Sequence, residues 1–275
     1  MSDFGLIGHP VEHSMSKVMH EAAFEEMGLE YVYGLFDVEE AELELFMEHA
    51  KFRGLNVTIP LKTAVIEHLD EVSPEADFIG SVNTVEFSGN RKIGHNTDVL
   101  GFMKCLEEAE VELEESTFLV LGSGGAGRGI VFKLAMEKHR VYNFDVDEMK
   151  CARLAEDVME KVGVRVEPVK VDGIKDTIKN VDVLVNATPV GMHPKIDRMP
   201  VPPDILHPAL TVVDIVYNPL ETKLLRYARQ RCEKAVNGVG MLVHQGAESL
   251  RIWLGQGPPV EVMRKAVLER LESQG

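Results

Sequence analysis

The sequence predicts an α/β protein with two domains, and three observations carry that prediction. Short β-rich apolar runs alternate with amphipathic helical stretches along most of the chain. The length of 275 residues exceeds the roughly 100–200 residues of a typical domain, which favours two domains. The alternation is most regular in the second half, as expected for a doubly wound parallel sheet.

The first half is expected to form a mixed sheet. Strands are predicted at residues 4–7, 31–36, 54–59, 82–87 and 91–94, with helices at 15–27 and 39–51. The last two strands flank Ser88-Gly89-Asn90, a typical hairpin turn, which would make them antiparallel. Pro60 closes the third strand and suits the first turn of a helix, so Lys62 is expected in that turn.

The second half is expected to form the parallel sheet. Strands are predicted at residues 118–121, 140–144, 164–169, 181–186 and 211–216, with helical segments between them. A helix over residues 99–109 and an acidic stretch over residues 107–115 connect the two halves. Two further helices, at residues 241–254 and 260–273, would fall in the second domain on sequence grounds alone.

The composition excludes several classes of partner. With 29 basic against 45 acidic residues, the net charge of −16 repels phosphate backbones, so neither nucleic acid nor an anionic membrane is expected as a partner. The 3 cysteines have no C-x-x-C spacing and the histidines show no metal-ligand pattern, so we expect reduced thiols and no metal. No apolar run reaches the ~18 residues of a membrane span, and no signal-peptide pattern opens the chain. We therefore expect a cytoplasmic protein.

A glycine-rich turn is the first candidate site. Its sequence, Gly122-Ser123-Gly124-Gly125-Ala126-Gly127, fits G-x-G-x-x-G and lies between a predicted strand and a predicted helix. The glycines permit a tight turn, and the helix N-terminus offers free N–H groups to a pyrophosphate. This context indicates a dinucleotide site, with an ordinary strand-to-helix turn as the alternative.

Asp145 is the candidate ligand of the ribose. It lies 23 residues after Gly122 (145 − 122), near the spacing of about 20 expected for that acid. A carboxylate accepts hydrogen bonds from a 2′-hydroxyl but repels a 2′-phosphate, by roughly 4 kcal/mol at about 4 Å with an effective dielectric constant of about 20. No arginine lies between Asp145 and Lys150, so we expect NAD to be preferred over NADP. The alternative is that Asp145 caps the next helix, a role that Asp147 can also fill.

Polar side chains gather in three loops of the first half. Ser14 and Ser16 open a helix, where two hydroxyls exceed what capping requires. Asn56 and Thr58 alternate with apolar residues before Lys62. The two hairpin strands are flanked by Asn83, Thr84, Asn96, Thr97 and Asp98. Such side chains suit a polyhydroxylated, anionic small molecule.

Together with a dinucleotide site, these loops indicate hydride transfer to or from an alcohol carbon. That chemistry needs a group that exchanges the hydroxyl proton while the cofactor carries the hydride. Lys62, oriented by Asp98, is the candidate. The alternatives are an exposed Lys62 at the surface and Asp98 as the N-cap of the helix over residues 99–109.

Eight separated motifs give the chain a resemblance to a known family. In order they are residues 13–16 (His-Ser-Met-Ser), 56–62 (Asn-Val-Thr-Ile-Pro-Leu-Lys), 81–84 (Ser-Val-Asn-Thr), 94–98 (Gly-His-Asn-Thr-Asp), the glycine turn, 186–192 (Asn-Ala-Thr-Pro-Val-Gly-Met), 214–219 (Asp-Ile-Val-Tyr-Asn-Pro) and 238–245 (Gly-Val-Gly-Met-Leu-Val-His-Gln). Over nearly its whole length the sequence resembles the shikimate dehydrogenase family, including its quinate/shikimate branch.

The resemblance implies the reversible oxidation of shikimate to 3-dehydroshikimate in aromatic amino-acid biosynthesis. The implied substrate ligands are Ser14, Ser16, Asn56, Thr58, Lys62, Asn83, Asp98, Tyr217 and Gln245, with Lys62 as the acid/base. The implied cofactor site comprises Gly122, Ser123, Gly124, Gly125, Ala126, Gly127, Asp145, Thr188, Ile215 and Gly238. The resemblance also implies a substrate domain over residues 1–98, to which helices within residues 241–275 return, and a Rossmann-type domain over residues 99–240.

One departure from the family bears on the cofactor. Many members carry Asn-Arg-Thr after the second Rossmann strand, where the arginine grips the 2′-phosphate of NADP, but this chain has Asp145-Val146-Asp147. The resemblance is therefore to NAD-preferring members, some of which also oxidise quinate, and NADP stays open as a cofactor. A quinate/shikimate dehydrogenase of catabolism is the alternative enzyme. A ligand-sensing regulator on the same fold is disfavoured by the acidic charge and by the presence of Lys62 and Asp98.

Overall fold

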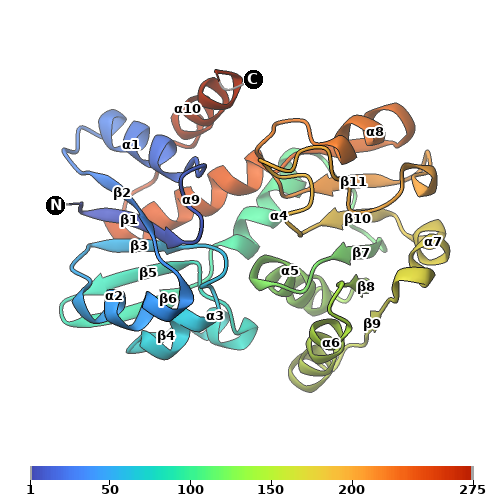
Figure 1. Ribbon diagram of the computed structural model, residues 1–275, viewed down its shortest axis with the longest axis horizontal. Coiled ribbons are helices and arrows are strands. Elements are labelled where there is room, and N and C mark those ends of the chain that lie inside the picture. The colour runs from blue at the N-terminus through green and yellow to red at the C-terminus, as the bar shows by residue number, and fades with distance from the viewer. Residues whose placement is uncertain (1, 274–275) are drawn as a thin grey trace. The chain divides into compact units, whose positions relative to one another are not determined.

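The computed structural model describes residues 2–273, which form two compact units (Figure 1). One unit comprises the described residues up to Gly101 together with those from Val243 onward, and the other comprises Phe102–Leu242. Each unit contains one six-stranded sheet, so the predicted α/β class with two sheets is confirmed.

The sheet of the first unit is mixed, as expected. Its strands are β1 (Phe4–Gly8), β2 (Tyr33–Asp37), β3 (Gly54–Val57), β4 (Glu71–Val72), β5 (Thr84–Ser88) and β6 (Arg91–His95), in the order β2-β1-β3-β5-β6-β4. β1 pairs in parallel with β2 and β3, whereas β5 is antiparallel to both β3 and β6. Ser88 pairs with Arg91, so the predicted hairpin turns on Gly89 and Asn90, with Gly89 at a φ of 63°.

Helices complete the first unit. They are α1 (Ser16–Glu26), a 3-10 turn (Glu40–Glu42) that leads into α2 (Leu43–His49), a 3-10 helix (Ala64–His68), α3 (Pro74–Ile79), the greater part of α9 (Val239–Leu254) and α10 (Val260–Glu272). α1 packs against α10. β4 and α3 were not predicted.

The prediction of a helical turn beginning at Pro60 is wrong. Residues 60–63 form a turn, and the 3-10 helix begins only at Ala64. The physical reason lies in the backbone bonding, because the Lys62 carbonyl accepts a hydrogen bond from the Val82 N–H at 2.8 Å. Lys62 is therefore held beside the segment that enters β5, and not within a helix.

The sheet of the second unit is entirely parallel. Its strands are β7 (Thr117–Leu121), β8 (Arg140–Phe144), β9 (Val166–Pro168), β10 (Val183–Asn186), β11 (Thr211–Asp214) and β12 (Lys234–Val236), in the order β12-β11-β10-β7-β8-β9. The chain order reverses between β7 and β10, which is the switch point where doubly wound sheets bind ligands at the carboxyl ends of their strands. The strand β12 was not predicted.

The helices of this unit follow the alternation expected from the sequence. They are most of α4 (Asp98–Glu108), then α5 (Gly125–Met136), α6 (Glu148–Val162), α7 (Ile174–Thr177) and α8 (Lys223–Arg231). α5 begins inside the glycine-rich turn, at Gly125.

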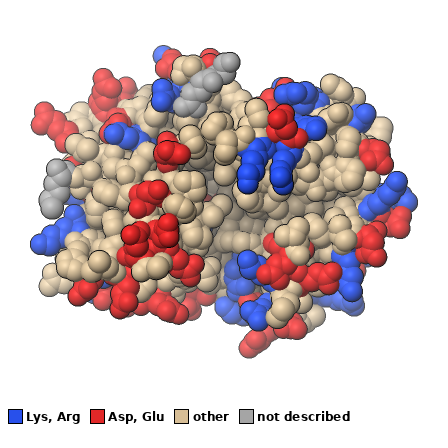
Figure 2. Space-filling view, viewed as in Figure 1, with Lys and Arg blue, Asp and Glu red and all other residues tan. Residues whose placement is uncertain are grey.

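Buried aliphatic side chains hold the strands of each unit to its helices. Leu55, Val57 and Val85 are buried in the first unit against Leu43 and Met47 of α2. The second unit has its own cluster, which joins strand residues to helix α8. Figure 2 shows acidic side chains spread over the visible face of the first unit, with both signs of charge interspersed on the second. Among the described residues, no helix is long and apolar enough to span a bilayer.

Candidate active site

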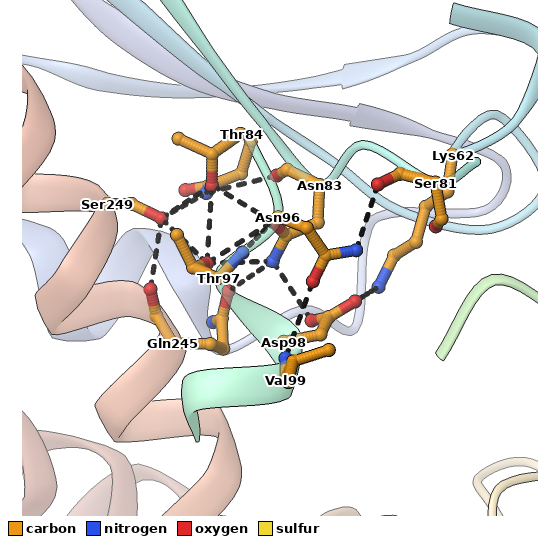
Figure 3. A network of polar contacts seen from close by, with 11 residues as sticks. Lys62, Ser81, Asn83, Thr84, Asn96, Thr97, Asp98, Val99, Gln245 and Ser249 are labelled. Carbon is orange, nitrogen blue, oxygen red and sulfur yellow. Dashed lines mark hydrogen bonds and ion pairs between the residues drawn. The ribbon is translucent and has the colours of Figure 1, made fainter. Parts of the chain in front are cut away.

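The hairpin of the first unit brings several predicted polar residues together (Figure 3). Thr84 at the start of β5 pairs with His95 at the end of β6. Asn83, which precedes β5, therefore lies beside Asn96, Thr97 and Asp98, which follow β6. The antiparallel pairing explains why residues more than ten positions apart in the chain share one site.

The Asn83 amide is at the centre of this network. Its Nδ2 donates to Asp98 Oδ1 at 2.9 Å, to Thr97 Oγ1 at 2.9 Å and to Gln245 Oε1 at 3.2 Å. Its Oδ1 accepts the Thr97 N–H at 2.7 Å. Asn83 therefore links the two ends of the hairpin to helix α9, which carries Gln245.

Lys62 and Asp98 form a close, sheltered ion pair. Lys62 Nζ donates to Asp98 Oδ2 at 2.5 Å, and the side chains are only 14% and 6% exposed. That low exposure excludes the alternative of a solvated surface lysine. Asn96 Oδ1 accepts the Val99 N–H at 3.3 Å, while both Asp98 oxygens bind other side chains, so Asp98 does not act as the helix cap.

Asn56 has protein partners on every side of its amide. Its Oδ1 accepts the Tyr33 hydroxyl at 2.7 Å, and its Nδ2 donates to Ser249 Oγ at 2.9 Å and to Thr84 Oγ1 at 3.2 Å. Asn56 thus bonds to side chains that adjoin the Asn83 network, and its role as a substrate ligand stays a prediction. Ser249 was missed, although its spacing of four residues from Gln245 puts both on one face of a helix.

The remaining predicted hydroxyls of the first unit differ in their partners. Ser14 Oγ donates to Ser16 Oγ at 3.1 Å and accepts the Ser16 N–H at 3.2 Å, so these two side chains are adjacent. Within residues 2–273, the half-buried Thr58 hydroxyl has no hydrogen-bond partner. Tyr217 belongs to the other unit, where it follows β11, and its role as a substrate ligand also stays a prediction.

His20 is a buried residue of α1 that was not predicted to contribute to the site. Its Nδ1 bonds to the Ser16 carbonyl at 2.7 Å, and its ring stacks on the Tyr33 ring at 4.5 Å. Its Nε2 is buried and lacks a partner among the described residues. Desolvation lowers the pKa of His20 to about 4, so the ring is neutral at physiological pH. The neutral ring therefore connects the start of α1, at the Ser16 carbonyl, to Tyr33 of β2.

In the second unit, three glycines of the turn have distinct roles. Gly122 has a φ of 105°, a conformation that side chains disfavour. A Cβ on Gly124 would meet nothing within 4 Å, whereas one on Gly127 would lie 2.2 Å from the Gly122 carbonyl oxygen. The first glycine makes the turn, the second leaves the backbone open to a ligand, and the third lets α5 pack closely.

This cradle fits a dinucleotide. Gly124 is the N-cap of α5, whose first N–H groups have no acceptor within the helix. Such groups bind the pyrophosphate of a nucleotide. Ser123, Gly125 and Ala126 lie in the same turn.

Asp145 lies against this turn. Its Oδ2 accepts the Ser123 N–H at 2.7 Å and its Oδ1 accepts the Asp147 N–H at 2.9 Å. Asp147 is the N-cap of α6, where it accepts the N–H groups of Met149 and Lys150. The alternative that Asp145 caps this helix is therefore wrong, and its carboxylate is oriented by backbone donors.

Asn143 is a second residue that was missed. It is fully buried, and its Nδ2 donates to the carbonyl oxygens of Val120 at 3.0 Å and Gly122 at 3.2 Å. Its Oδ1 accepts the Ser123 hydroxyl at 2.7 Å. Asn143 therefore holds the glycine turn in place. In the sequence it could have been noticed as a single amide side chain inside an apolar strand.

The other predicted cofactor residues follow neighbouring strands of the same sheet. Asn186 Oδ1, at the end of β10, accepts the Thr188 N–H at 3.1 Å and its hydroxyl at 2.6 Å. Ile215 follows β11, and a Cβ on Gly238 would lie 2.1 Å from the Ile215 carbonyl oxygen. Thr188, Ile215 and Gly238 therefore lie beyond the carboxyl ends of β10, β11 and β12. No cluster of three or more metal-ligating side chains occurs among residues 2–273.

Comparison with known protein families gives matches at both ends of the chain. Residues 6–85 match the family described as the shikimate dehydrogenase substrate binding domain. Residues 238–268 match the family described as the shikimate 5′-dehydrogenase C-terminal domain.

Individual relatives match over nearly the full length. The shikimate dehydrogenase (NADP(+)) of Methanopyrus kandleri is 48% identical over 277 residues, covering 97% of this chain and 95% of the relative. The crystal structure of shikimate 5-dehydrogenase from Thermus thermophilus with NADP(H) and shikimate is 36% identical, with a TM-score of 0.84, covering 98% and 99% of the two chains. Quinate dehydrogenase from Corynebacterium glutamicum in complex with NAD is 34% identical, with a TM-score of 0.86, covering 97% and 98%.

Proposed function

This chain belongs to the shikimate dehydrogenase family, and from that premise we propose that it oxidises shikimate to 3-dehydroshikimate with NAD preferred over NADP. The observation that carries the proposal is the ion pair of Lys62 and Asp98 at 2.5 Å, beside the Asn83 amide. It places one amine and one carboxylate among hydrogen-bonding groups in a sheltered part of the first unit.

The substrate side offers donors and acceptors that suit shikimate, a ring that carries a carboxylate and hydroxyl groups. Ser14, Ser16 and Thr58 supply hydroxyls, which donate to a carboxylate without adding charge. Asp98 and Gln245 supply acceptors for the ring hydroxyls. The assignments of Asn56 and Tyr217 remain part of the same proposal.

Lys62 is the residue that exchanges the hydroxyl proton in this proposal. Oxidation of an alcohol carbon releases a proton and a hydride, and a nicotinamide cofactor, when bound, would supply the acceptor for the hydride. In the reduction direction the Lys62 ammonium donates a proton to the reacting oxygen, and in the oxidation direction Lys62, having first released a proton to solvent, accepts the hydroxyl proton as the neutral amine. Asp98 Oδ2 fixes the amine, and Asn83 fixes Asp98 through its other oxygen. The ion pair thus positions the amine before the substrate arrives.

On the cofactor side, residues 122–127 would hold the pyrophosphate, while Thr188, Ile215 and Gly238 would line the remainder of the dinucleotide. Asp145 would bind the ribose, because each of its oxygens accepts one backbone N–H and can accept a second hydrogen bond. A 2′-phosphate beside this carboxylate meets like charge, and residues 146–149 contain no lysine or arginine. The name of the Methanopyrus relative points to NADP, whereas the quinate dehydrogenase holds NAD.

The cofactor test compares catalytic efficiencies. We would measure kcat/KM for shikimate with NAD and with NADP, in the wild type, in Asp145→Asn and in the control Asp147→Asn. We expect the wild type to favour NAD by at least about tenfold, a fraction of the ~4 kcal/mol repulsion between like charges at contact. Asp145→Asn should narrow this ratio and Asp147→Asn should not. Equal or greater efficiency with NADP would overturn the NAD preference but leave the reaction intact.

Quinate is the second candidate substrate, on the strength of the NAD-bound quinate dehydrogenase among the structural relatives. Quinate carries an additional hydroxyl at the carbon that bears its carboxylate. Measuring kcat/KM for quinate beside shikimate decides between the two enzymes, since a quinate value equal to or above that for shikimate supports the catabolic alternative.

The proposed setting is the cytoplasm. The sequence has only 3 cysteines and no C-x-x-C spacing, as is usual for proteins kept under reducing conditions. The net charge of −16 disfavours nucleic acid and anionic membranes as partners.

A further inference from the structure

Asp214, at the end of β11, is a buried carboxylate that is neither a proposed substrate ligand nor a proposed cofactor ligand. It has no exposed surface, and three donors from three segments bind it. Oδ1 accepts Asn186 Nδ2 at 2.9 Å and the Val216 N–H at 3.1 Å, while Oδ2 accepts the Thr222 hydroxyl at 2.6 Å. Burial raises the pKa of Asp214 to about 6, so the charged form is costly at this position.

Two of these donors lead to residues assigned to the cofactor. Asn186, held by Asp214, presents its Oδ1 to the N–H and hydroxyl of Thr188. The Val216 N–H belongs to the peptide that follows Ile215, so its bond to Asp214 fixes the course of the chain after β11. The carbonyl of Ile215 lies so close to Gly238 that no Cβ fits between them. A shift at Asp214 would therefore reach Thr188, Ile215 and Gly238.

The third donor leads away from the cofactor. Thr222 is the N-cap of α8 and accepts the Leu225 N–H at 3.2 Å. One carboxylate therefore joins the loop after β10, the loop after β11 and the start of α8. A neutral amide at this position offers a single acceptor oxygen, whereas the carboxylate offers two.

We propose that Asp214 is a positioning residue of the cofactor site, which acts by holding Thr188 and Ile215 in the arrangement that binds the dinucleotide. This inference rests on the proposed function, which assigns Thr188 and Ile215 to the cofactor. Asp214 itself does not touch the dinucleotide. Its effect is transmitted through Asn186 and through the backbone of Val216.

The test measures dissociation constants by calorimetry. The ligands are the two dinucleotides, NADH and NADPH, and, separately, shikimate. The variants are Asp214→Ala, Asp214→Asn, Thr188→Ala and the double variant with Asp214→Asn and Thr188→Ala. Asp182→Asn is the control, because the exposed Asp182 accepts the Thr117 N–H at 2.8 Å at the amino-terminal ends of β7 and β10, the opposite end of these strands from Thr188. Circular dichroism establishes that each variant is folded.

We expect Asp214→Ala to weaken dinucleotide binding by about tenfold or more, since it leaves buried donors without an acceptor next to Thr188. Asp214→Asn should weaken it by about threefold, because its remaining oxygen serves Asn186 and Val216. The control should stay within about twofold of wild type for every ligand. Shikimate binding by the Asp214 variants should fall less than dinucleotide binding, because of the residues assigned to the substrate only Tyr217 directly follows Val216. If Asp214 acts through Thr188, the double variant should bind the dinucleotide about as well as whichever single variant, Asp214→Asn or Thr188→Ala, binds it more weakly.

The outcomes separate the inference from the proposed function. A folded Asp214→Ala that binds dinucleotide like the wild type, with Thr188→Ala impaired, overturns the positioning role and leaves the function standing. Losses that add fully in the double variant also overturn it, because they indicate a general structural effect. If Thr188→Ala binds like the wild type, the assignment of this loop to the cofactor fails first. Should Asp214→Ala not fold, unchanged binding by Asp214→Asn decides against the inference.

Discussion

Acidification is expected to destabilise the first unit through His20. The ring is fully buried between α1 and Tyr33, and its desolvation lowers the pKa from the ordinary value of 6.5 to about 4. The unfolded chain therefore binds a proton more readily than the folded chain. The stability due to the neutral ring is fully present above pH 6.5, and it is lost as the pH falls from there toward 4.

The two pKa values set the size of the effect. At about pH 5 the histidine of the unfolded chain is mostly protonated while the buried ring is still mostly neutral. Proton linkage between pKa values of 6.5 and about 4 gives a loss of about 2 kcal/mol in the free energy of unfolding between about pH 7.5 and about pH 5. That loss is a large share of the ~5–15 kcal/mol that stabilises a typical domain.

The molecule provides a probe for this unit alone. Its single tryptophan, Trp253, lies on α9, where the ring stacks on Phe4 at 5.0 Å and lies 5.7 Å from His20. Urea unfolding followed by tryptophan fluorescence at the two pH values therefore reports on the first unit. His20→Gln removes the titrating ring, so its loss of stability on acidification should be smaller than that of the wild type by about 2 kcal/mol.

His49→Gln is the matched control. His49 Nδ1 also bonds a backbone carbonyl four residues earlier, that of Leu45 at 3.0 Å, but the residue is exposed on α2. It should keep the wild-type response to pH. If His20→Gln loses as much stability as the wild type between the two pH values, burial of His20 is not the cause and the reasoning is refuted.

Three further predictions concern the sites themselves. Lys62→Ala should lower kcat by about 10²–10⁴ with a smaller effect on shikimate binding, and near-normal turnover would remove Lys62 from the mechanism. Asp214 is expected to change stability with pH in the opposite direction to His20. Its pKa rises from 3.8 to about 6 in the fold, so the free energy of unfolding of the wild type falls by about 3 kcal/mol as the pH rises through this window. In Asp214→Asn, the stability of β10 and β11 measured by hydrogen exchange should not show this fall. The same pH dependence in the variant as in the wild type would show that Asp214 is not its cause. Gly127→Ala, whose Cβ would lie 2.2 Å from the Gly122 carbonyl oxygen, should weaken NADH binding at least tenfold by calorimetry. The control Gly173→Ala meets only Val169, at 3.6 Å, and equal affinities in the two variants would show that the close packing is unimportant.

Local patterns were sufficient to predict most of the fold. The glycine turn was recognisable because its context, a strand before and a helix after, is written in adjacent residues. The hairpin was recognisable from Gly89 and Asn90 for the same reason. By contrast, β4 has only two residues, Glu71 and Val72, and its pairing with β6 depends on a segment about 20 residues away.

The site was predicted less completely, because part of it depends on contacts between distant segments. Lys62 and Asp98 were paired from their residue types, and the structure brings them together. Ser249 and Asn143 escaped notice, since nothing near them in the chain indicates that one reaches Asn56 and the other the glycine turn. The error at Pro60 had a similar origin, because the bond from Val82 to Lys62 is not visible in the local sequence.

The β5–β6 hairpin has a practical consequence for labelling the protein. Asn83 and Asp98 lie at its open end, whereas Gly89 and Asn90 lie five residue pairs away, which is about 17 Å along the strands. A fluorophore or a short affinity peptide introduced at the exposed Asn90 would therefore leave the chemistry undisturbed. Such a handle would let ligand occupancy be followed on single immobilised molecules.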